Sequence, residues 1–273
     1  MKKRALVILI TICILLVGCN IGETKVDYER LIKALDEGDM ATVMSTSDDG
    51  YAYVEERVNI STREESNDKI YDDLLYQSTE GVINVKEKRM YGTTNQRLKN
   101  IIETKIEGKR DKDIKENIIY TTPFIYENGT AKGGNRNIES LLINIGMNRL
   151  RGISSIIPKY DTAGGDEPNR ISYSLTESEF QTIINDDLKI KYDELNSAKI
   201  TIYFTNAEDC KGCNMTINDL RISIDYNKEN EQGKLLSHTY NIDWIFVDKE
   251  SNKEVSKEKY SEFEKDYNKS IKE

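Results

Sequence analysis

The stretch YAYVEERVNI (residues 51–60) decides the fold, because its apolar and polar residues alternate. In an extended chain, one face receives the apolar side chains of Ala52, Val54, Val58 and Ile60. The opposite face receives Tyr53, Glu55 and Arg57. An alternation of period two is typical of a β-strand that buries one face. The stretch therefore predicts a strand that lies on the core.

Segments of similar character follow along the chain. They predict strands at 70–77 and 82–91, joined by a turn at 78–81, and at 118–126, where Pro123 indicates a sheet edge. Residues 93–107 are ambiguous, because their apolar side chains also suit an amphipathic helix. The last third is predicted to be mostly β, with strands at 171–174, 199–205, 220–226 and 235–247.

Helical patterns occur between and beyond these strands. Asp27 is a suitable N-cap for a helix that Gly38 interrupts, and a long helix is predicted over 138–157. Thr176 and Glu179 have the spacing of a capping box and predict a helix start. A terminal helix carries an apolar stripe formed by Tyr260, Phe263, Tyr267 and Ile271.

The order of these elements predicts the fold class. The strands are joined by turns or short loops more often than by crossover helices, which favours antiparallel pairing. No internal repeat or low-complexity linker divides residues 27–273, so they are expected to form one domain. We therefore expect an α+β fold: a curved, mainly antiparallel sheet with helices covering one face.

The first twenty residues have the layout of an export signal. Lys2, Lys3 and Arg4 precede an apolar run of thirteen residues, 5–17, and a small residue follows. A membrane-spanning helix needs about twenty apolar residues, so this run is too short to be one. Ordinary secretion is the alternative to a membrane anchor.

The ending LVGC (16–19) resembles the lipobox of bacterial lipoproteins. The resemblance implies that residues 1–18 are removed as a signal peptide and that Cys19 carries the lipid, including palmitate. It also implies that residues 19–26 form a tether. The protein would then be anchored on the extracytoplasmic face of the cell membrane, where two acyl chains make an anchor durable.

A second resemblance concerns the body of the protein. The stretch ISYSLTESEFQTII (171–184), preceded by the lipobox, the tether and the N-terminal helix, resembles LolA/LppX-type half-barrel lipoproteins. It is also similar to uncharacterised surface lipoproteins of low-GC Gram-positive bacteria. The resemblance implies a sheet wrapped around an apolar cavity that holds lipid. It supplies no catalytic or binding residue.

Composition restricts the possible partners. The chain carries a net charge of −9, or −12 once residues 1–18 with their three basic side chains are removed. Nucleic-acid binding relies on Lys and Arg to neutralise phosphates, so a nucleic-acid partner is not expected. Hydrophobic residues make up 37% of the chain, and sixteen tyrosines add aromatic surface, so the body should fold.

Cys210 and Cys213 are the cysteines that remain after Cys13 and Cys19 are assigned to the leader and the anchor. In an extracytoplasmic protein such a pair is compatible with a short disulfide. The stretch KITIYFTNAEDCKGC (199–213) also resembles the strand-then-CxxC layout of thioredoxin-like proteins, which implies thiol-disulfide exchange as the alternative. A zinc site needs four ligands, and the acidic loop at 161–167 lacks EF-hand spacing, so no metal is predicted.

The segment 235–247 carries the candidate ligand-binding residues. One face of this strand bears His238, Tyr240, Ile242, Trp244 and Phe246. Such a face is either ordinary sheet core or the lining of a cavity for a hydrophobic ligand. His238 is the chain's single histidine and lacks a recognisable nucleophile partner, so a structural role is expected.

The sequence therefore predicts a non-enzymatic, lipid-anchored protein without a cofactor. Its partners would be the membrane, through the anchor, and either a hydrophobic or lipidic ligand or another protein of the envelope. A thiol-disulfide protein and a structural or adhesive surface module are the alternatives.

Overall fold

The structure is a computed structural model. It describes residues 28–44, 46–47, 49–106, 109–134, 136–138, 150–161, 170–204, 216–246 and 257–272.

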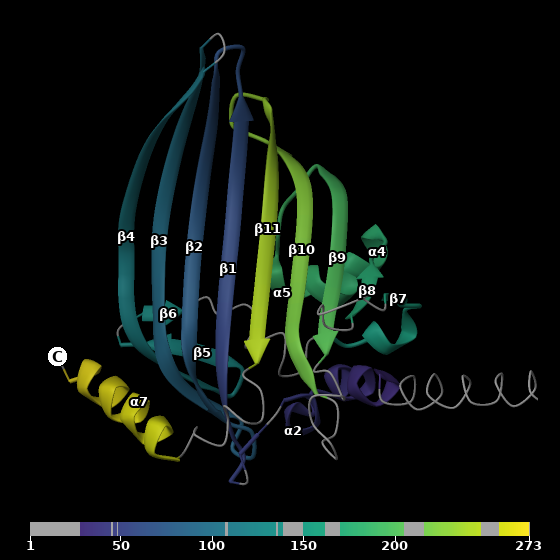
Figure 1. Ribbon diagram of the computed structural model, residues 1–273, viewed down its shortest axis with the longest axis vertical. Helices are drawn as coiled ribbons and strands as arrows, with labels where there is room; N and C mark the ends of the chain where they lie inside the picture. The colour runs from purple at the N-terminus through teal and green to yellow at the C-terminus, as the bar shows by residue number, and fades with distance from the viewer. Residues whose placement is uncertain are drawn as a thin grey trace, which may run out of the picture.

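Within these residues, eleven strands form a single sheet in which every neighbouring pair is antiparallel (Figure 1). The strand order is β6-β5-β4-β3-β2-β1-β11-β10-β9-β8-β7, so the first and last strands lie side by side in the centre. The strands are β1 (Tyr51–Glu65), β2 (Lys69–Asn84), β3 (Arg89–Ile106), β4 (Lys109–Glu127), β5 (Thr130–Gly133), β6 (Arg136–Ile138), β7 (Lys159–Asp161), β8 (Arg170–Ser174), β9 (Glu194–Phe204), β10 (Ile217–Glu229) and β11 (Leu235–Phe246).

The helices are short apart from the first and the last. They are a helix over 28–37, α2 (Met40–Val43), the 3₁₀ turn η1 (Ile153–Ser155), α4 (Glu177–Phe180), the π-helical turn η2 (Gln181–Asn185), α5 (Asp186–Leu188) and α7 (Lys257–Ser270). Gly38, with φ +71°, ends the first helix, and the capping box of Thr176 and Glu179 starts α4; both were predicted. No helix among the described residues is long and apolar enough to cross a membrane.

The sheet has two faces, which we call inner and outer. The inner face carries the main core, in which Ala52 and Val54 of β1 pack with Leu31 and Leu35 of the first helix and with Phe180 of α4. The outer face carries a smaller cluster, in which Tyr260 of α7 packs on residues from β1 to β4. These are Tyr51, Val82, Tyr91 and Ile125.

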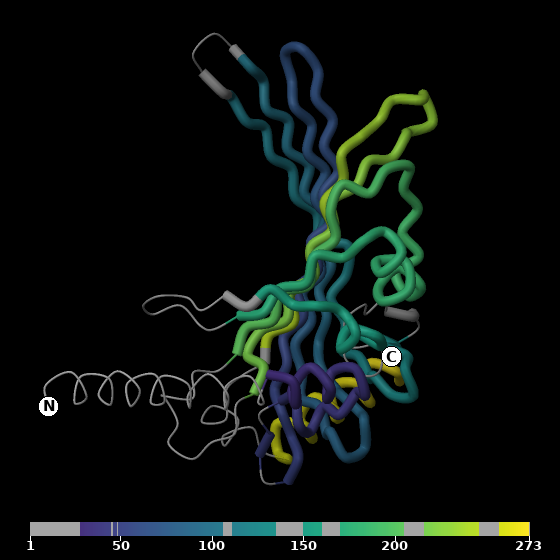
Figure 2. The backbone as a smooth tube through the Cα atoms, turned by 90° about the vertical axis from the view of Figure 1, so that its right-hand side faces the viewer, coloured from purple at the N-terminus to yellow at the C-terminus, as the bar shows by residue number. Residues whose placement is uncertain are grey.

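The sheet is strongly twisted and curved, and its upper half extends beyond the helices (Figure 2). The predicted α+β fold with a curved antiparallel sheet is thus confirmed. The first helix and α4 lie on the inner face as expected, whereas α7 adds a layer on the outer face.

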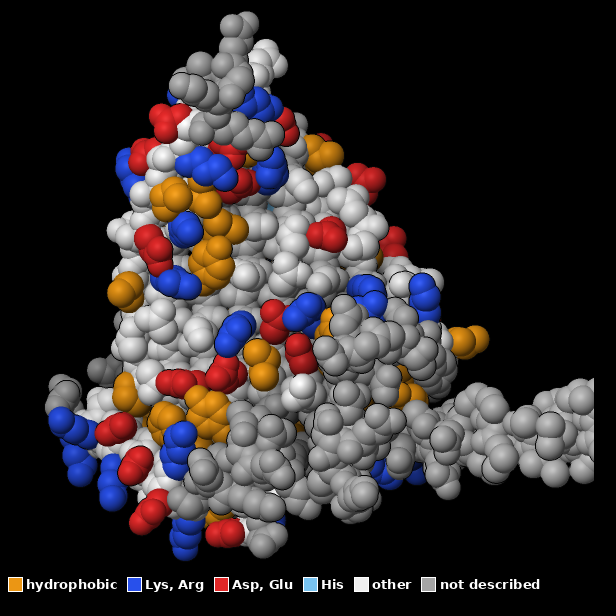
Figure 3. Space-filling model, in the orientation of Figure 1, with side chains coloured by type: hydrophobic (Ala, Val, Ile, Leu, Met, Phe, Trp, Pro, Cys, Tyr) orange, Lys and Arg blue, Asp and Glu red, His pale blue; other side chains and the backbone are white. Residues whose placement is uncertain are grey.

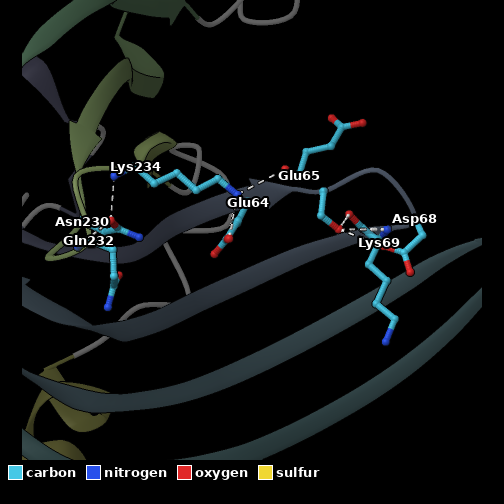
Figure 4. A network of polar contacts seen from close by, with 8 residues as sticks. Glu64, Glu65, Asp68, Lys69, Asn230, Gln232 and Lys234 are labelled. Carbon is cyan, nitrogen blue, oxygen red and sulfur yellow. Dashed lines mark hydrogen bonds and ion pairs between the residues drawn. The ribbon is translucent and has the colours of Figure 1, made fainter.

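The upper ends of two hairpins are tied together (Figure 4). Lys234, in the turn between β10 and β11, donates from Nζ to Glu64 Oε1 at 2.7 Å and to the Glu65 carbonyl at 3.3 Å. Within the first hairpin, Ser66 Oγ accepts from the backbone N–H of Lys69 at 3.2 Å. The turn of β1–β2 therefore holds the turn of β10–β11 in place.

The turn predicted at 78–81 is wrong, because β2 continues to Asn84 and the chain turns at 85–88. Gly81, which suggested that turn, instead faces Gly92 of β3. A Cβ on Gly81 would lie 2.3 Å from the Tyr91 carbonyl oxygen, so the glycine permits close contact between strands. The turn itself is stabilised by Asn84 Oδ1, which accepts from two backbone N–H groups.

The helical interpretation of 93–107 is also wrong, because β3 runs through residues 89–106 and pairs with β2 and β4. Of the helix predicted over 138–157, residues 139–149 lie outside the described part, while Ile138 belongs to β6 and 150–157 contain only η1. At Pro123, β4 pairs with β3 on one side only. On the other side β5 pairs with residues 125–127 of β4 and does not reach Pro123. The edge position predicted from this proline is confirmed.

Candidate functional site

The predicted ligand-binding residues belong to β11, at the centre of the sheet between β1 and β10. Tyr240, Ile242 and Trp244 are buried on the inner face, and His238 is half-buried. Phe246 continues the strand opposite Val54, but its side chain lies outside the described part. The burial therefore decreases from Trp244 toward His238, at the upper end of the row.

Trp244 lies at the closed end of this row. Its neighbours in register are Glu56 of β1 and Leu220 of β10, and both are buried. Ile242 lies between Val58 and Ile222 and is equally enclosed. This end of the row is packed core, which a ligand cannot reach without displacing side chains.

His238 lies at the open end, where aromatic rings gather. Its ring stacks on Tyr226 with centroids 4.9 Å apart and an interplanar angle of 6°, and Nδ1 is 3.0 Å from the Thr62 hydroxyl. Burial, and to a smaller extent the charge of Lys228, lowers the pKa of His238. A neutral, stacked imidazole is suited to packing and hydrogen bonding.

At the level of Tyr240, a row of apolar side chains crosses four strands. The pairing register aligns Tyr240 of β11 with Ile60 of β1, Leu75 of β2 and Leu98 of β3. Tyr240 is buried, whereas the other three are only partly so. An apolar row that is half-open to solvent offers contact area to an apolar ligand.

A polar row lies directly beside it on the same face. Gln77 of β2 accepts from Gln96 Nε2 of β3 at 3.2 Å and from the Tyr120 hydroxyl of β4 at 3.4 Å. Gln77 is buried, and the other two are half-buried. We call the two rows together the cross-strand patch; its members are Tyr240, Ile60, Leu75, Leu98, Gln77, Gln96 and Tyr120.

Further polar groups lie in the next row toward the core. Thr79 and Thr94 are buried and their hydroxyls are 2.9 Å apart, and Glu56 is buried in the same row of the register. A few polar groups that converge beside an apolar wall are typical of sites for small amphiphilic molecules. The cross-strand patch is therefore our candidate site.

Sequence reasoning missed most of this patch. It found Tyr240 from the alternation of 235–247, but it placed a turn next to Gln77 and a possible helix over Gln96 and Leu98. The local signal that was available is weak and consists of Leu98, which lies between the charged residues Arg97 and Lys99. That signal becomes informative only when the pairing of β2 with β3 is known.

The outer face carries a cluster of charges over the central strands, where Figure 3 shows acidic and basic side chains side by side. Arg221 of β10 donates to Asp243 of β11 and lies 3.5 Å from Asp219. Burial raises the pKa of Asp219 to about 6, although the charge of Arg221 opposes the rise. This cluster was not predicted, because its residues meet only through the register of β10 and β11.

Three predicted site residues lie outside the described residues: Cys19, Cys210 and Cys213.

Part of the chain matches the model of a protein family. Residues 14–118 are similar to the family described as "Domain of unknown function (DUF3952)". The matched region includes the first helix, β1 to β3 and the first part of β4. No curated protein matches the chain.

Proposed function

We propose that this is a non-enzymatic, extracytoplasmic protein, anchored to the membrane through lipid on Cys19, that binds an amphiphilic ligand on the cross-strand patch. The single observation that carries the binding proposal is the pairing of two rows on the inner face. The partly open apolar row suits an acyl chain or another apolar group. The glutamine–tyrosine row beside it suits a hydrogen-bonding head group.

The burial of the side chains favours this location over the one predicted first. Ile242 and Trp244 are enclosed by the core, whereas Ile60, Leu75 and Leu98 keep part of their surface open. The ligand would therefore lie across the strands at the level of Tyr240 rather than along β11 toward Trp244. The amide groups of Gln77 and Gln96 both donate and accept hydrogen bonds, so they suit a head group that offers acceptors, donors or both.

The test compares two neighbouring leucines on β2. Leu75 belongs to the patch, whereas Leu74 points to the outer face, opposite Ser61 and Lys99. Palmitate and lysophosphatidylcholine serve as probes, and binding to the purified protein is measured by titration calorimetry and native mass spectrometry. We expect Leu75→Glu to weaken binding about tenfold or more, because a carboxylate would have to be buried under the ligand.

Leu74→Glu introduces the same charge on the same strand and is the matched control, which should bind the probes as the unmodified protein does. Circular dichroism establishes that both variants are folded. The proposal is wrong if the unmodified protein binds neither probe, or if the two variants bind equally well.

A further inference from the structure

The upper part of β4 forms a free sheet edge in the described residues. β5 pairs only with residues Ile125–Glu127 of β4, whereas β3 pairs with β4 along its whole length. Residues 111–119 are all exposed, and this part of the sheet rises above the helices (Figures 1 and 2). An exposed edge strand offers backbone N–H and C=O groups to another strand.

This edge also carries large apolar side chains. Ile114 is 51% exposed and Ile118 is 71% exposed, and the space-filling view shows apolar side chains in the upper part of the sheet (Figure 3). The register between β3 and β4 shifts at Ile119, which is an additional residue opposite Gln96 and Arg97. The regular edge therefore ends at Ile118.

We propose that this edge pairs with the same edge of a second copy of the chain, antiparallel, with Ile114 opposite Ile114 of the second copy. Along a regular strand, alternate residues direct their backbone groups outward. When two identical edges pair, each residue must therefore lie opposite the same residue of the second copy or opposite one whose number differs from its own by an even number. This requirement leaves few registers for residues 111–118.

The charges along the edge select one of these registers. With Ile114 on the two-fold axis, Asp113 lies opposite Lys115 of the second copy, and Lys112 lies opposite Glu116. The symmetry repeats each contact, which gives four pairs of opposite charge. The registers one step away place Asp113 against Asp113 or Lys115 against Lys115, and like charges directly opposite each other destabilise a sheet.

Ion pairs within each copy extend this pattern. Glu116 contacts Arg97 of β3 at 3.0 Å, and Lys112 contacts Glu103 of β3 at 3.3 Å. Directly opposite residues of an antiparallel pair share a face. In the proposed pair, the charges therefore alternate in sign across four strands. They run from Arg97 of β3 and Glu116 of β4 in one copy to Lys112 of β4 and Glu103 of β3 in the second copy. Each of the two edge charges would lie between two opposite charges.

A second copy explains this edge better than an unrelated strand does. Lysines on an edge strand normally discourage pairing with other chains. Here Lys112 and Lys115 disfavour a partner strand that lacks carboxylates opposite them. A second copy of this chain supplies those carboxylates, from Glu116 and Asp113. The pairing is isologous and closed, so it yields a dimer rather than a fibre.

Cross-linking tests the register. The processed full chain, in detergent and carrying Cys210→Ser and Cys213→Ser, receives Ile114→Cys. Directly opposite residues have Cα atoms about 4.5–5.5 Å apart, which a disulfide spans, so we expect a covalent dimer on mild oxidation. Ile118→Cys is the control, because two such residues would lie about 27 Å apart in this register.

The control position is more exposed than Ile114, so random collisions would favour cross-linking there. Equal cross-linking of the two variants, or none at Ile114→Cys relative to the parent chain, overturns the proposal.

Charge exchange provides the second measurement, by sedimentation velocity of chains with their native cysteines. Asp113→Lys sets two lysines opposite each other and should raise the dimer Kd about tenfold or more. The double variant Asp113→Lys/Lys115→Asp restores opposite charges and should restore the dimer. Lys199→Glu, an exposed charge reversal on β9, should have no effect. A monomeric parent chain, or a double variant no better than Asp113→Lys, overturns the proposal.

Discussion

The packing around Trp244 determines how much this residue contributes to stability. It is the single tryptophan, it is 1% exposed, and it lies between Glu56 and Leu220 at the centre of the sheet. We expect Trp244→Ala to lower the free energy of unfolding by about 3–5 kcal/mol, because the packed core leaves a cavity. Urea unfolding followed by circular dichroism measures the loss. Trp244→Phe should lose less, and a loss below about 1 kcal/mol for the alanine variant would show that this end of the row is not packed.

Asp219 makes stability depend on pH. Its ordinary pKa of 3.8 rises to about 6 in the folded protein, chiefly through burial. Between pH 4 and 6 the unfolded state loses this proton before the folded state does, so the carboxyl lowers stability as the pH rises through that range. Above pH 6 the cost is complete.

Asp219→Asn removes this cost. We expect it to raise the free energy of unfolding by about 1 kcal/mol at pH 7, a figure reduced for the group's partial exposure, and to have little effect at pH 4. Asp243→Asn is the comparison, since it removes the negative charge that Arg221 contacts and should destabilise instead. Urea unfolding at the two pH values is the measurement. A variant that is less stable than the parent at pH 7 would contradict the assignment.

At the scale of elements, the contact between β2 and β3 depends on glycine. A Cβ on Gly92 would lie 2.0 Å from the Glu80 carbonyl oxygen and 2.8 Å from the Gly81 Cα, and both are backbone atoms that cannot rotate away. We expect Gly92→Ala to destabilise the protein by about 3 kcal/mol or more, measured by thermal unfolding. Gly129→Asn is a mild control, because a Cβ at Gly129 meets no atom within 4 Å and asparagine tolerates a positive φ. Equal unfolding temperatures for the two variants would refute the close approach.

The elements that sequence predicted well are those whose signals are local. The alternation of 51–60, the capping box at Thr176 and the interruption at Gly38 each depend on residues adjacent in the chain. The upper parts of β2, β3 and β4 were harder to predict as strands. Both of their faces meet solvent there, so apolar and polar residues do not alternate along them. Gly81 misled for a related reason, since its role is to face Gly92 across the strands.

The candidate site was harder still to predict. Its members come from β11, β1, β2, β3 and β4, and only the register aligns them. Of these members, sequence alone proposed Tyr240 as a ligand-binding residue, because the alternation of its strand predicts an apolar face. It had no means of placing Leu75 and Leu98 beside Tyr240.

At the scale of the whole molecule, the anchor proposal is tested at Cys19. Cys19 is the residue that would carry the thioether-linked lipid under this proposal, so Cys19→Ser should release the protein into the medium or block its processing. Fractionation of cells and intact-mass analysis of the membrane-bound form are the measurements. Cys210→Ser is the control and should stay with the membrane. An unmodified Cys19 in the membrane-bound protein would contradict the proposal.

The direction of β4 has a consequence for cells. The first helix and the lower end of the sheet lie together, so an N-terminal lipid would hold this end next to the bilayer (Figure 1). Antiparallel pairing at Ile114 turns the second copy upside down. With β4 continuing to Glu127 in each copy, the two lower ends would lie about 90 Å apart. If the anchor and the edge pairing are both as proposed, such a pair would join two apposed membranes more readily than it would sit upright in one, and would form a bridge between neighbouring cells.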